Sequence, residues 1–336
     1  MKFKVGITIK TYERTQLPLM LAKHGAQLIT RVCRTQEDLI EHFADADAIM
    51  TTSAPFTRKV FGRLKHCRGV VRIGVGMDNF DIPAATEQGV LLANTTSFYI
   101  EDVANHTIAF ILACSRNLLE VDSAVRAGKW SLDLVTLRRL SLQTIGIIGF
   151  GEIAENMVPK LKAFGPRIIV YHPRRTPEQI ASFGCEAADL DRVIRDSDFL
   201  VLLCPLNEET KNLIDKKAMK AMKKSAFLIN TARAGIVNEV DLHQALSEKW
   251  IAGAAVDVFS VEPPPPNHPL LGLKNTLVSP HIGWFSEDSR NEAAVKASEE
   301  VIRILRGERP INLINPEVFR IHGKPGCGRR AAPAKP

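Results

Sequence analysis

Short apolar runs rich in valine and isoleucine alternate with helix-length amphipathic stretches along almost the whole chain. The first series comprises Lys4–Ile9, Ala26–Val32, Ala48–Thr51, Val70–Ile73 and Val90–Ala93. The second series comprises Thr144–Ile148, Arg167–Tyr171, Asp198–Leu203, Ala226–Asn230, Ala252–Val256 and Thr276–Val278. These runs are too short for buried helices, and their near-continuous apolar character is typical of strands covered on both faces. The alternation predicts an α/β protein with two Rossmann-like, doubly wound parallel sheets.

The helical patterns between these runs predict how the chain divides into domains. Shorter helices are predicted over Glu37–Phe43, Ile82–Gln88, Glu152–Phe164 and Val240–Ser247. A long helix over Ile100–Ala127, closed by Gly128, connects the two series. Another over Ser286–Arg306 follows the last strand, and we expect it to return to the first series. The expected domains are a discontinuous first domain, 1–99 plus 287–319, and a second domain, 100–286.

The net charge of +7 raises the question of a nucleic-acid partner. Residues 320–336 hold five lysines and arginines and no acid, which leaves the other 319 residues at only +2. This end of the chain is also rich in proline, glycine and alanine, so we predict a disordered basic tail. A nearly neutral body excludes nucleic acid as the expected partner.

Cysteine spacing and hydropathy indicate the cellular compartment in which the protein is expected. The six cysteines are scattered without CxxC pairs, which favours free thiols in a reducing compartment over disulfides or a zinc site. No apolar run approaches the roughly 18 residues of a membrane span, and the N-terminus is too charged for a signal peptide. We therefore expect a cytoplasmic protein with no membrane and no metal.

A glycine-rich turn follows the predicted strand that ends at Ile148. It reads Gly149-Phe150-Gly151-Glu152-Ile153-Ala154 and opens a predicted helix. Gly149 permits the tight turn, Gly151 lets the backbone approach a pyrophosphate, and Ala154 lets the helix pack closely on the strand. The helix N-terminus then offers N–H groups to the anion. This context predicts a dinucleotide site.

The residues at the end of the next strand bear on the choice of dinucleotide. A carboxylate that would hold the ribose hydroxyls of NAD is absent, and His172, Arg174 and Arg175 stand there instead. Guanidinium groups bind phosphate in a bidentate fork. The sequence favours NADP(H), with NAD(H) as the alternative if the arginines are merely a solvated pair.

Three polar residues follow strands of the second series. Arg233, Glu262 and His281 come after the fourth, fifth and sixth runs. Because ligands bind outside the carboxyl ends of such strands, we expect them to face one pocket. Arginine suits a substrate carboxylate, histidine suits proton transfer, and a carboxylate beside the histidine fixes its tautomer. The set predicts hydride transfer between a nicotinamide and a 2-oxo acid.

Several segments together resemble the D-isomer-specific 2-hydroxyacid dehydrogenase family over about residues 45–315. They are Gly74–Asn79, Val103–His106, Gly146–Gly151, Cys204–Thr210, Asn230–Arg233, Asp257–Phe259 with Glu262-Pro263, and Ser279–Gly283. The resemblance is to the phosphoglycerate-dehydrogenase-like and C-terminal-binding-protein-like branch. It implies a catalytic cleft between the domains and a homodimer built through the cofactor domain.

The resemblance also implies roles for individual residues. Arg233 would bind and orient the substrate, His281 would be the acid/base, and Glu262 would pair with His281. Asp257 would contact the nicotinamide carboxamide, and the loop at Val75 and Gly76 would bind the substrate carboxylate. The remaining cofactor contacts it implies are Glu152, Ile153, Cys204, Pro205, Leu206, Thr210, Thr231, Ala232 and Gly283.

The chain departs from the family pattern at four positions. Ala234 replaces a glycine after the catalytic arginine, which carries strain if that position needs positive φ. Glu152 places an acid near the phosphates, and Asn105 replaces a common glutamate. Trp284 replaces a small residue, and we expect it to narrow the pocket mouth or stack on a ligand.

The leading interpretation is an NADP(H)-preferring reductase of a small 2-oxo acid, with hydroxypyruvate or glyoxylate first. A second is NAD-dependent oxidation of a D-2-hydroxy acid such as 3-phosphoglycerate, or of phosphite, although Val75 offers no cation for phosphite. A third, of another class, is a dinucleotide-sensing interaction protein. The intact Arg233, Glu262 and His281 favour an enzyme.

Overall fold

A computed structural model describes residues 2–323 of the chain. The chain divides into two compact units, Met1–Phe98 with Ser286–Pro336, and Tyr99–Phe285. Helix α13 covers Glu317–His322, so the disordered tail expected from residue 320 was placed too early. The rest of that tail, with Cys327, lies outside the described residues.

The first unit contains a five-stranded parallel sheet in the order β2-β1-β3-β4-β5. The strands are β1 Phe3–Ile7, β2 Ala26–Thr30, β3 Ala48–Thr51, β4 Gly69–Arg72 and β5 Leu91–Asn94. The helices between them are α1 Leu17–Lys23, α2 Gln36–Phe43, α3 Arg58–Phe61 and α4 Ile82–Glu87. This order is one of the two common doubly wound arrangements, as predicted.

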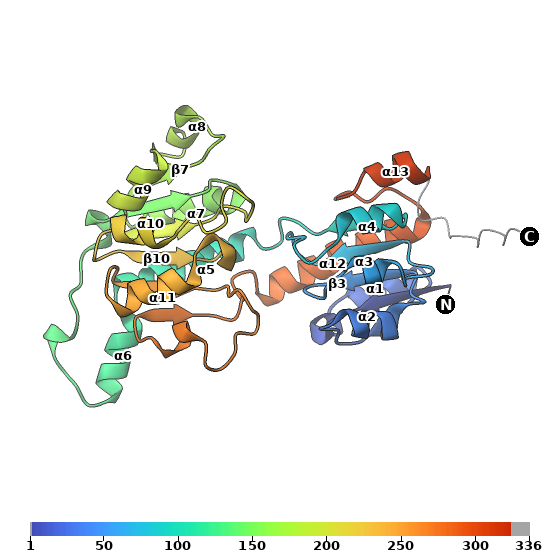
Figure 1. Ribbon diagram of the computed structural model, residues 1–336, viewed down its shortest axis with the longest axis horizontal. Coiled ribbons are helices and arrows are strands. Elements are labelled where there is room, and N and C mark those ends of the chain that lie inside the picture. The colour runs from blue at the N-terminus through green and yellow to red at the C-terminus, as the bar shows by residue number, and fades with distance from the viewer. Residues whose placement is uncertain (1, 324–336) are drawn as a thin grey trace, which may run out of the picture. The chain divides into compact units, whose positions relative to one another are not determined.

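Helix α12, Glu287–Arg306, packs on β3 and β4 of the first unit, as expected (Figure 1). It begins at a capping box on Ser286 and ends at Gly307, whose φ of 74° is left-handed. The packing leaves no room for a side chain at Gly69, where a Cβ would lie 2.8 Å from Cδ1 of Ile304. The last helix therefore completes the sheet that the first residues begin.

The second unit contains a seven-stranded parallel sheet in the order β12-β11-β10-β9-β6-β7-β8. The strands are β6 Thr144–Ile148, β7 Arg167–Tyr171, β8 Glu186–Ala187, β9 Phe199–Leu202, β10 Phe227–Asn230, β11 Gly253–Val256 and β12 Thr276–Val278. The helices are α5 Ile100–Ser115, α6 Leu118–Arg126, α7 Glu152–Lys162, α8 Pro177–Ala181, α9 Leu190–Asp196, α10 Lys216–Ala221 and α11 Glu239–Ser247. The strand order reverses between β6 and β9, and dinucleotides bind at such a switch point.

Helices cover both faces of this sheet, which explains its continuous apolar strands. Ile168 and Val170 of β7 belong to a core formed with α5 and α7, while Ile169 belongs to a second core with α9, α10 and α11. Alternating side chains point to opposite faces of a strand, so both faces of β7 are buried. The predicted bounds of the strands agree with those of the structure to within two residues at each end.

Two local predictions were wrong. The single helix expected over Ile100–Ala127 is two helices, α5 and α6, separated at Asn117, which has a left-handed φ of 45°. Asparagine adopts this conformation more readily than most residues, and the helix cannot continue through it. Strand β8 was missed because it has only two residues, too few to show a pattern.

Candidate active site

The turn after β6 has the geometry that a dinucleotide site requires. Gly149 has a φ of +96°, and a Cβ there would lie 2.5 Å from the backbone nitrogen of Cys204. Gly151 caps α7, and a Cβ there would meet no atom within 4 Å. Glu152 is exposed, whereas Ala154 is buried in the core. The turn leaves open space at the N-terminus of α7, where a pyrophosphate fits.

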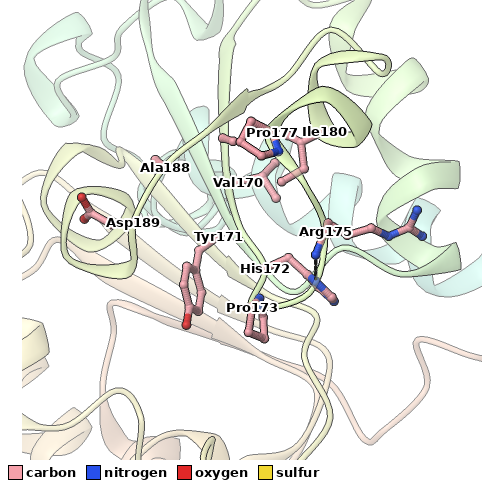
Figure 2. Close-up of a pocket in the computed structure, with 10 residues that line it drawn as sticks. Val170, Tyr171, His172, Pro173, Arg175, Pro177, Ile180, Ala188 and Asp189 are labelled. Carbon is pink, nitrogen blue, oxygen red and sulfur yellow. Dashed lines mark hydrogen bonds between the residues drawn. The ribbon is translucent and has the colours of Figure 1, made fainter.

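An open pocket of about 480 Å³ lies beside the end of β7 (Figure 2). It is lined by Val170, Tyr171, His172, Pro173, Arg175, Pro177, Ile180, Ala187, Ala188 and Asp189. In this pocket Nδ1 of His172 accepts backbone hydrogen bonds from Arg174 at 3.1 Å and Arg175 at 3.0 Å. Burial, and then the charges of Arg175 and Arg174, lower the pKa of His172. The neutral ring therefore shapes the loop that carries both arginines.

The two arginines differ in their surroundings. The Arg175 guanidinium forms an ion pair with Glu155 of α7, and Figure 2 shows it pointing away from Tyr171 and Pro173. Arg174 is exposed. From the sequence, the two arginines were predicted to act as an equivalent pair. Nothing in the sequence marked Glu155, twenty residues before Arg175, as its ion-pair partner.

The loop after β9 is closed by a threonine. Thr210 Oγ1 donates to the carbonyl of Pro205 at 2.6 Å and accepts from the backbone N–H of Asn207 at 2.8 Å. Cys204 is buried, and burial raises the pKa of its thiol to about 11. Thr210 thus builds the turn after Cys204 and Pro205, and the thiol stays protonated at neutral pH.

Arg233 follows β10 in a loop that Asn230 holds. The side-chain amide of Asn230 donates to the carbonyl of Arg233 at 2.9 Å and its oxygen accepts from the N–H of Ala232 at 3.1 Å. Ala234 opens a short 3-10 helix, Ala234–Ile236, and its φ is not positive, so alanine carries no strain there. The expected cost of replacing glycine at this position is absent.

His281 and Glu262 form the pair that the sequence predicted. His281 Nδ1 lies 2.7 Å from Glu262 Oε2, and Glu262 Oε1 accepts the backbone N–H of Phe259 at 3.1 Å. Burial alone would raise the pKa of Glu262, but the His281 hydrogen bond and charge, the Phe259 N–H and the Arg233 charge lower it. The His281 side chain is 40% exposed, so a small molecule can reach it.

Asp257, expected to contact the nicotinamide, holds the loop that follows β12. Its carboxylate accepts from Ile282 N at 2.9 Å, Gly283 N at 2.8 Å and the hydroxyl of Ser279. Only 2% of the residue is exposed. This use of Asp257 was not predicted from the sequence, although a buried carboxylate needs such donors.

The remaining predicted site residues lie in separate surroundings. Thr231 Oγ1 lies 2.8 Å from Thr107 Oγ1 of α5, and Leu206 packs against Gly235. Trp284 meets Phe285 edge-on at 5.5 Å. Val75 and Gly76 belong to the first unit, where their carbonyls accept from the side chains of Asn94 at 3.1 Å and Arg72 at 3.0 Å.

The model of the D-isomer specific 2-hydroxyacid dehydrogenase NAD binding domain matches residues 108–283, more than half of the chain. The chain belongs to this family. It is 36% identical to a glyoxylate reductase of Korarchaeum cryptofilum over 288 residues, 84% of this chain and 87% of that protein. It is also 36% identical to a D-3-phosphoglycerate dehydrogenase of Methanocaldococcus jannaschii, over 84% of this chain but 54% of that protein.

Solved structures agree with this family assignment. The TT0316 protein of Thermus thermophilus matches with a TM-score of 0.82 and 28% identity, over 93% of this chain and 99% of that chain. Membership confirms the predicted fold and an oxidoreductase that acts on the CH–OH group of small 2-hydroxy acids with a nicotinamide dinucleotide. Within residues 2–323, no helix is long and apolar enough to cross a membrane, and no cluster of metal-ligating side chains occurs.

Proposed function

We propose that this dehydrogenase works as an NADPH-dependent reductase of a small 2-oxo acid, with glyoxylate or hydroxypyruvate as its substrate. The observation that carries the proposal is the 2.7 Å pair of His281 and Glu262 on the unit that bears the glycine turn. The charge of Arg233 acts on this same Glu262. The relatives named glyoxylate reductases cover most of the chain and support the choice of substrate.

The proposed roles follow from the chemistry of reduction. The bound dinucleotide supplies a hydride to the carbonyl carbon. Arg233 binds the substrate carboxylate and polarises the carbonyl, because its guanidinium matches a carboxylate. His281 donates the proton that the new alkoxide oxygen takes up, and Glu262 holds Nδ1 so that Nε2 faces the substrate. Val75, Gly76 and Trp284 stay predicted substrate contacts.

The loop after β7 supports a preference for NADPH. No carboxylate follows β7 at His172, where an acid would repel a 2′-phosphate. The neutral His172 ring accepts the N–H groups of Arg174 and Arg175 and so fixes the loop beside the pocket. Since Arg175 is paired with Glu155, we assign the 2′-phosphate chiefly to the exposed Arg174.

The test is the loss of nicotinamide absorbance with NADPH or NADH and a panel of 2-oxo acids: glyoxylate, hydroxypyruvate, pyruvate and longer acids. We expect NADPH and one of the first two acids to give the highest kcat/KM. Faster oxidation of NADH would contradict the assignment of Arg174. Tight dinucleotide binding without turnover of any acid would instead favour a dinucleotide sensor.

Replacing Arg174 by alanine should weaken NADPH more than NADH. A charge-assisted hydrogen bond contributes about 1.5–3 kcal/mol, so we expect KM for NADPH to rise about 10- to 100-fold while KM for NADH stays within about twofold. Steady-state kinetics with each dinucleotide measure this. Arg195→Ala, which changes another exposed arginine, on α9, is the matched control and should change neither KM. An equal rise in both values for the Arg174 variant would refute the phosphate contact.

We propose a homodimer formed through the face of α6 and the segment that follows it. Helix α6 has no buried residue. Its exposed apolar residues and those of residues 128–142 include Leu118, Leu119, Val125, Trp130, Leu132, Leu137 and Leu142. Trp130 is 89% and Leu132 98% exposed, and several large apolar side chains exposed along one segment of the chain are typical of an interface. The expected occupant is the same face of a second copy.

Changing Trp130 and Leu132 together to aspartate should convert the dimer to a monomer. Burying two carboxylates in an apolar interface is strongly unfavourable. Sedimentation velocity at micromolar concentration gives the mass, and Val240→Asp on α11, where valine is 79% exposed, is the control. A wild-type monomer, or a variant that remains a dimer, would contradict the proposal.

We also propose a reducing, cytoplasmic compartment. The five cysteines of the described chain are all buried free thiols, Cys33, Cys67, Cys114, Cys185 and Cys204. Such thiols persist where glutathione and thioredoxin keep cysteine reduced.

A further inference from the structure

Two neighbouring residues of α5 reach the two loops that carry the proposed catalytic residues. His106 Nε2 lies 3.0 Å from Ser279 Oγ, two residues before His281. Thr107 Oγ1 lies 2.8 Å from Thr231 Oγ1, two residues before Arg233. Helix α5 is therefore tied to both loops, and the proposed mechanism uses neither His106 nor Thr107.

The donor and the acceptor of each hydrogen bond between His106 and the loop after β12 can be assigned. The Ser279 hydroxyl donates its proton to Asp257 Oδ1, so its oxygen accepts from His106 Nε2–H. A proton on Nε2 of the His106 ring satisfies this chain of hydrogen bonds. The Phe110 ring, 4.4 Å away between centroids, packs on the imidazole and restricts its rotation. His106 is thus the outer donor of a network that ends on a buried carboxylate.

Asp257 transmits this network to His281 through the backbone. Its main-chain carbonyl accepts the N–H of His281 at 2.8 Å, and its carboxylate accepts the next two N–H groups, those of Ile282 and Gly283. His281 has a φ of +53°, a left-handed conformation that is uncommon for residues other than glycine. The bonds to Asp257 impose it.

The packing around Gly283 leaves this arrangement little freedom. A Cβ at Gly283 would lie 2.9 Å from Asp257 Oδ2 and 3.4 Å from His106 Cδ2. The loop backbone is therefore in contact with both side chains. A displaced His106 would open space beside Gly283 and the Asp257 carboxylate.

We propose that His106 is a positioning residue for His281: through Ser279 and Asp257 it holds the left-handed loop that keeps the imidazole beside Glu262. The proposal rests on the proposed function, in which His281 is the proton donor. The proposed mechanism assigns His106 no contact with substrate or dinucleotide. It acts on the geometry of the loop that carries His281, so its loss should affect the chemical step far more than dinucleotide binding.

The test compares His106→Leu with His106→Gln in the full-length enzyme. Leucine keeps the apolar contact with Phe110 and removes the donor, whereas the glutamine amide can donate to Ser279. We expect leucine to lower kcat about tenfold, the effect of a lost hydrogen bond to a buried network, with the Kd for NADPH within about twofold of wild type. Glutamine should restore kcat to within about threefold.

A second readout does not depend on turnover. Amide hydrogen exchange at Ile282 and Gly283, whose N–H groups Asp257 accepts, should accelerate about tenfold in the leucine variant and stay slow in the glutamine variant. His243→Leu is the matched control, because His243 Nε2 also faces a serine hydroxyl, Ser247, at 3.5 Å on the exposed side of α11. The control should leave kcat and these exchange rates unchanged.

The outcomes separate this proposal from the proposed function. Unchanged kcat and exchange in the leucine variant would overturn the role of His106, as would equal losses with leucine and glutamine. If the wild-type protein reduces no 2-oxo acid, the proposed function fails. The exchange experiment then still decides whether His106 holds the loop.

Discussion

Replacing His281 by asparagine is expected to lower kcat for 2-oxo acid reduction by about 10²- to 10⁴-fold, the usual contribution of a general acid. Asparagine is chosen because it adopts the left-handed backbone that His281 shows, with a φ of +53°. The loop can therefore stay in place while the proton donor is lost. Stopped-flow single turnovers with NADPH and glyoxylate measure the chemical step directly.

Two companion measurements define what the His281 result means. The Kd for NADPH should stay within about twofold of wild type, since the glycine turn lies on another loop. Glu262→Gln keeps a side chain of the same shape beside Nδ1 but removes the charge, so we expect a smaller loss of kcat. If the asparagine variant retains more than about a tenth of wild-type kcat, another residue supplies the proton.

The second large effect is expected at the two glycines of the turn after β6, and it differs between them. Gly151→Ala places a methyl group in open space on an extended backbone, with φ −106° and ψ −166°, so the fold should be as stable as wild type. That space is where we place the pyrophosphate. Overpacking there amounts to about 1–3 kcal/mol, so the Kd for NADPH should rise about 5- to 150-fold.

Gly149→Ala is expected to affect the stability of the fold, in contrast to Gly151→Ala. Its Cβ would lie 2.5 Å from the Cys204 nitrogen, in a residue with a φ of +96°. A destabilisation of about 2–3 kcal/mol lowers Tm by roughly 5–10 °C in a domain of this size. Thermal melts and NADPH fluorescence titrations of both variants measure these effects. Unchanged NADPH binding by Gly151→Ala would mean that the dinucleotide does not approach this turn.

The sequence predicted the sheets well because strand periodicity and burial are local signals. β3, β6, β7 and β12 have the predicted bounds, since their apolar runs begin and end abruptly. The break at Asn117 was not predicted because one asparagine inside a helical pattern is usually tolerated. Nothing in the local sequence pattern marks its left-handed backbone, which separates α5 from α6.

Some features of the candidate site could likewise be predicted from the sequence, and others could not. His281 and Glu262 were recognised because each follows a strand, so the topology places both at one edge of the sheet. The loop bonds of Asp257 and the ion pair of Arg175 with Glu155 were not predicted. They join residues 20 to 26 positions apart, and their existence depends on loop backbones such as the left-handed His281. Spacing alone carries no information on such backbones.

The return of α12 to the first sheet sets the order in which this chain can become stable during synthesis. Leu92 N–H donates to Asn315 Oδ1 across 223 positions, and α12 closes on β3 and β4. The second unit, by contrast, is complete once Phe285 has left the ribosome. At about 5–20 residues per second, the first sheet waits at least ten seconds or so for its covering helix. The part of the chain made first is thus the part that finishes folding last.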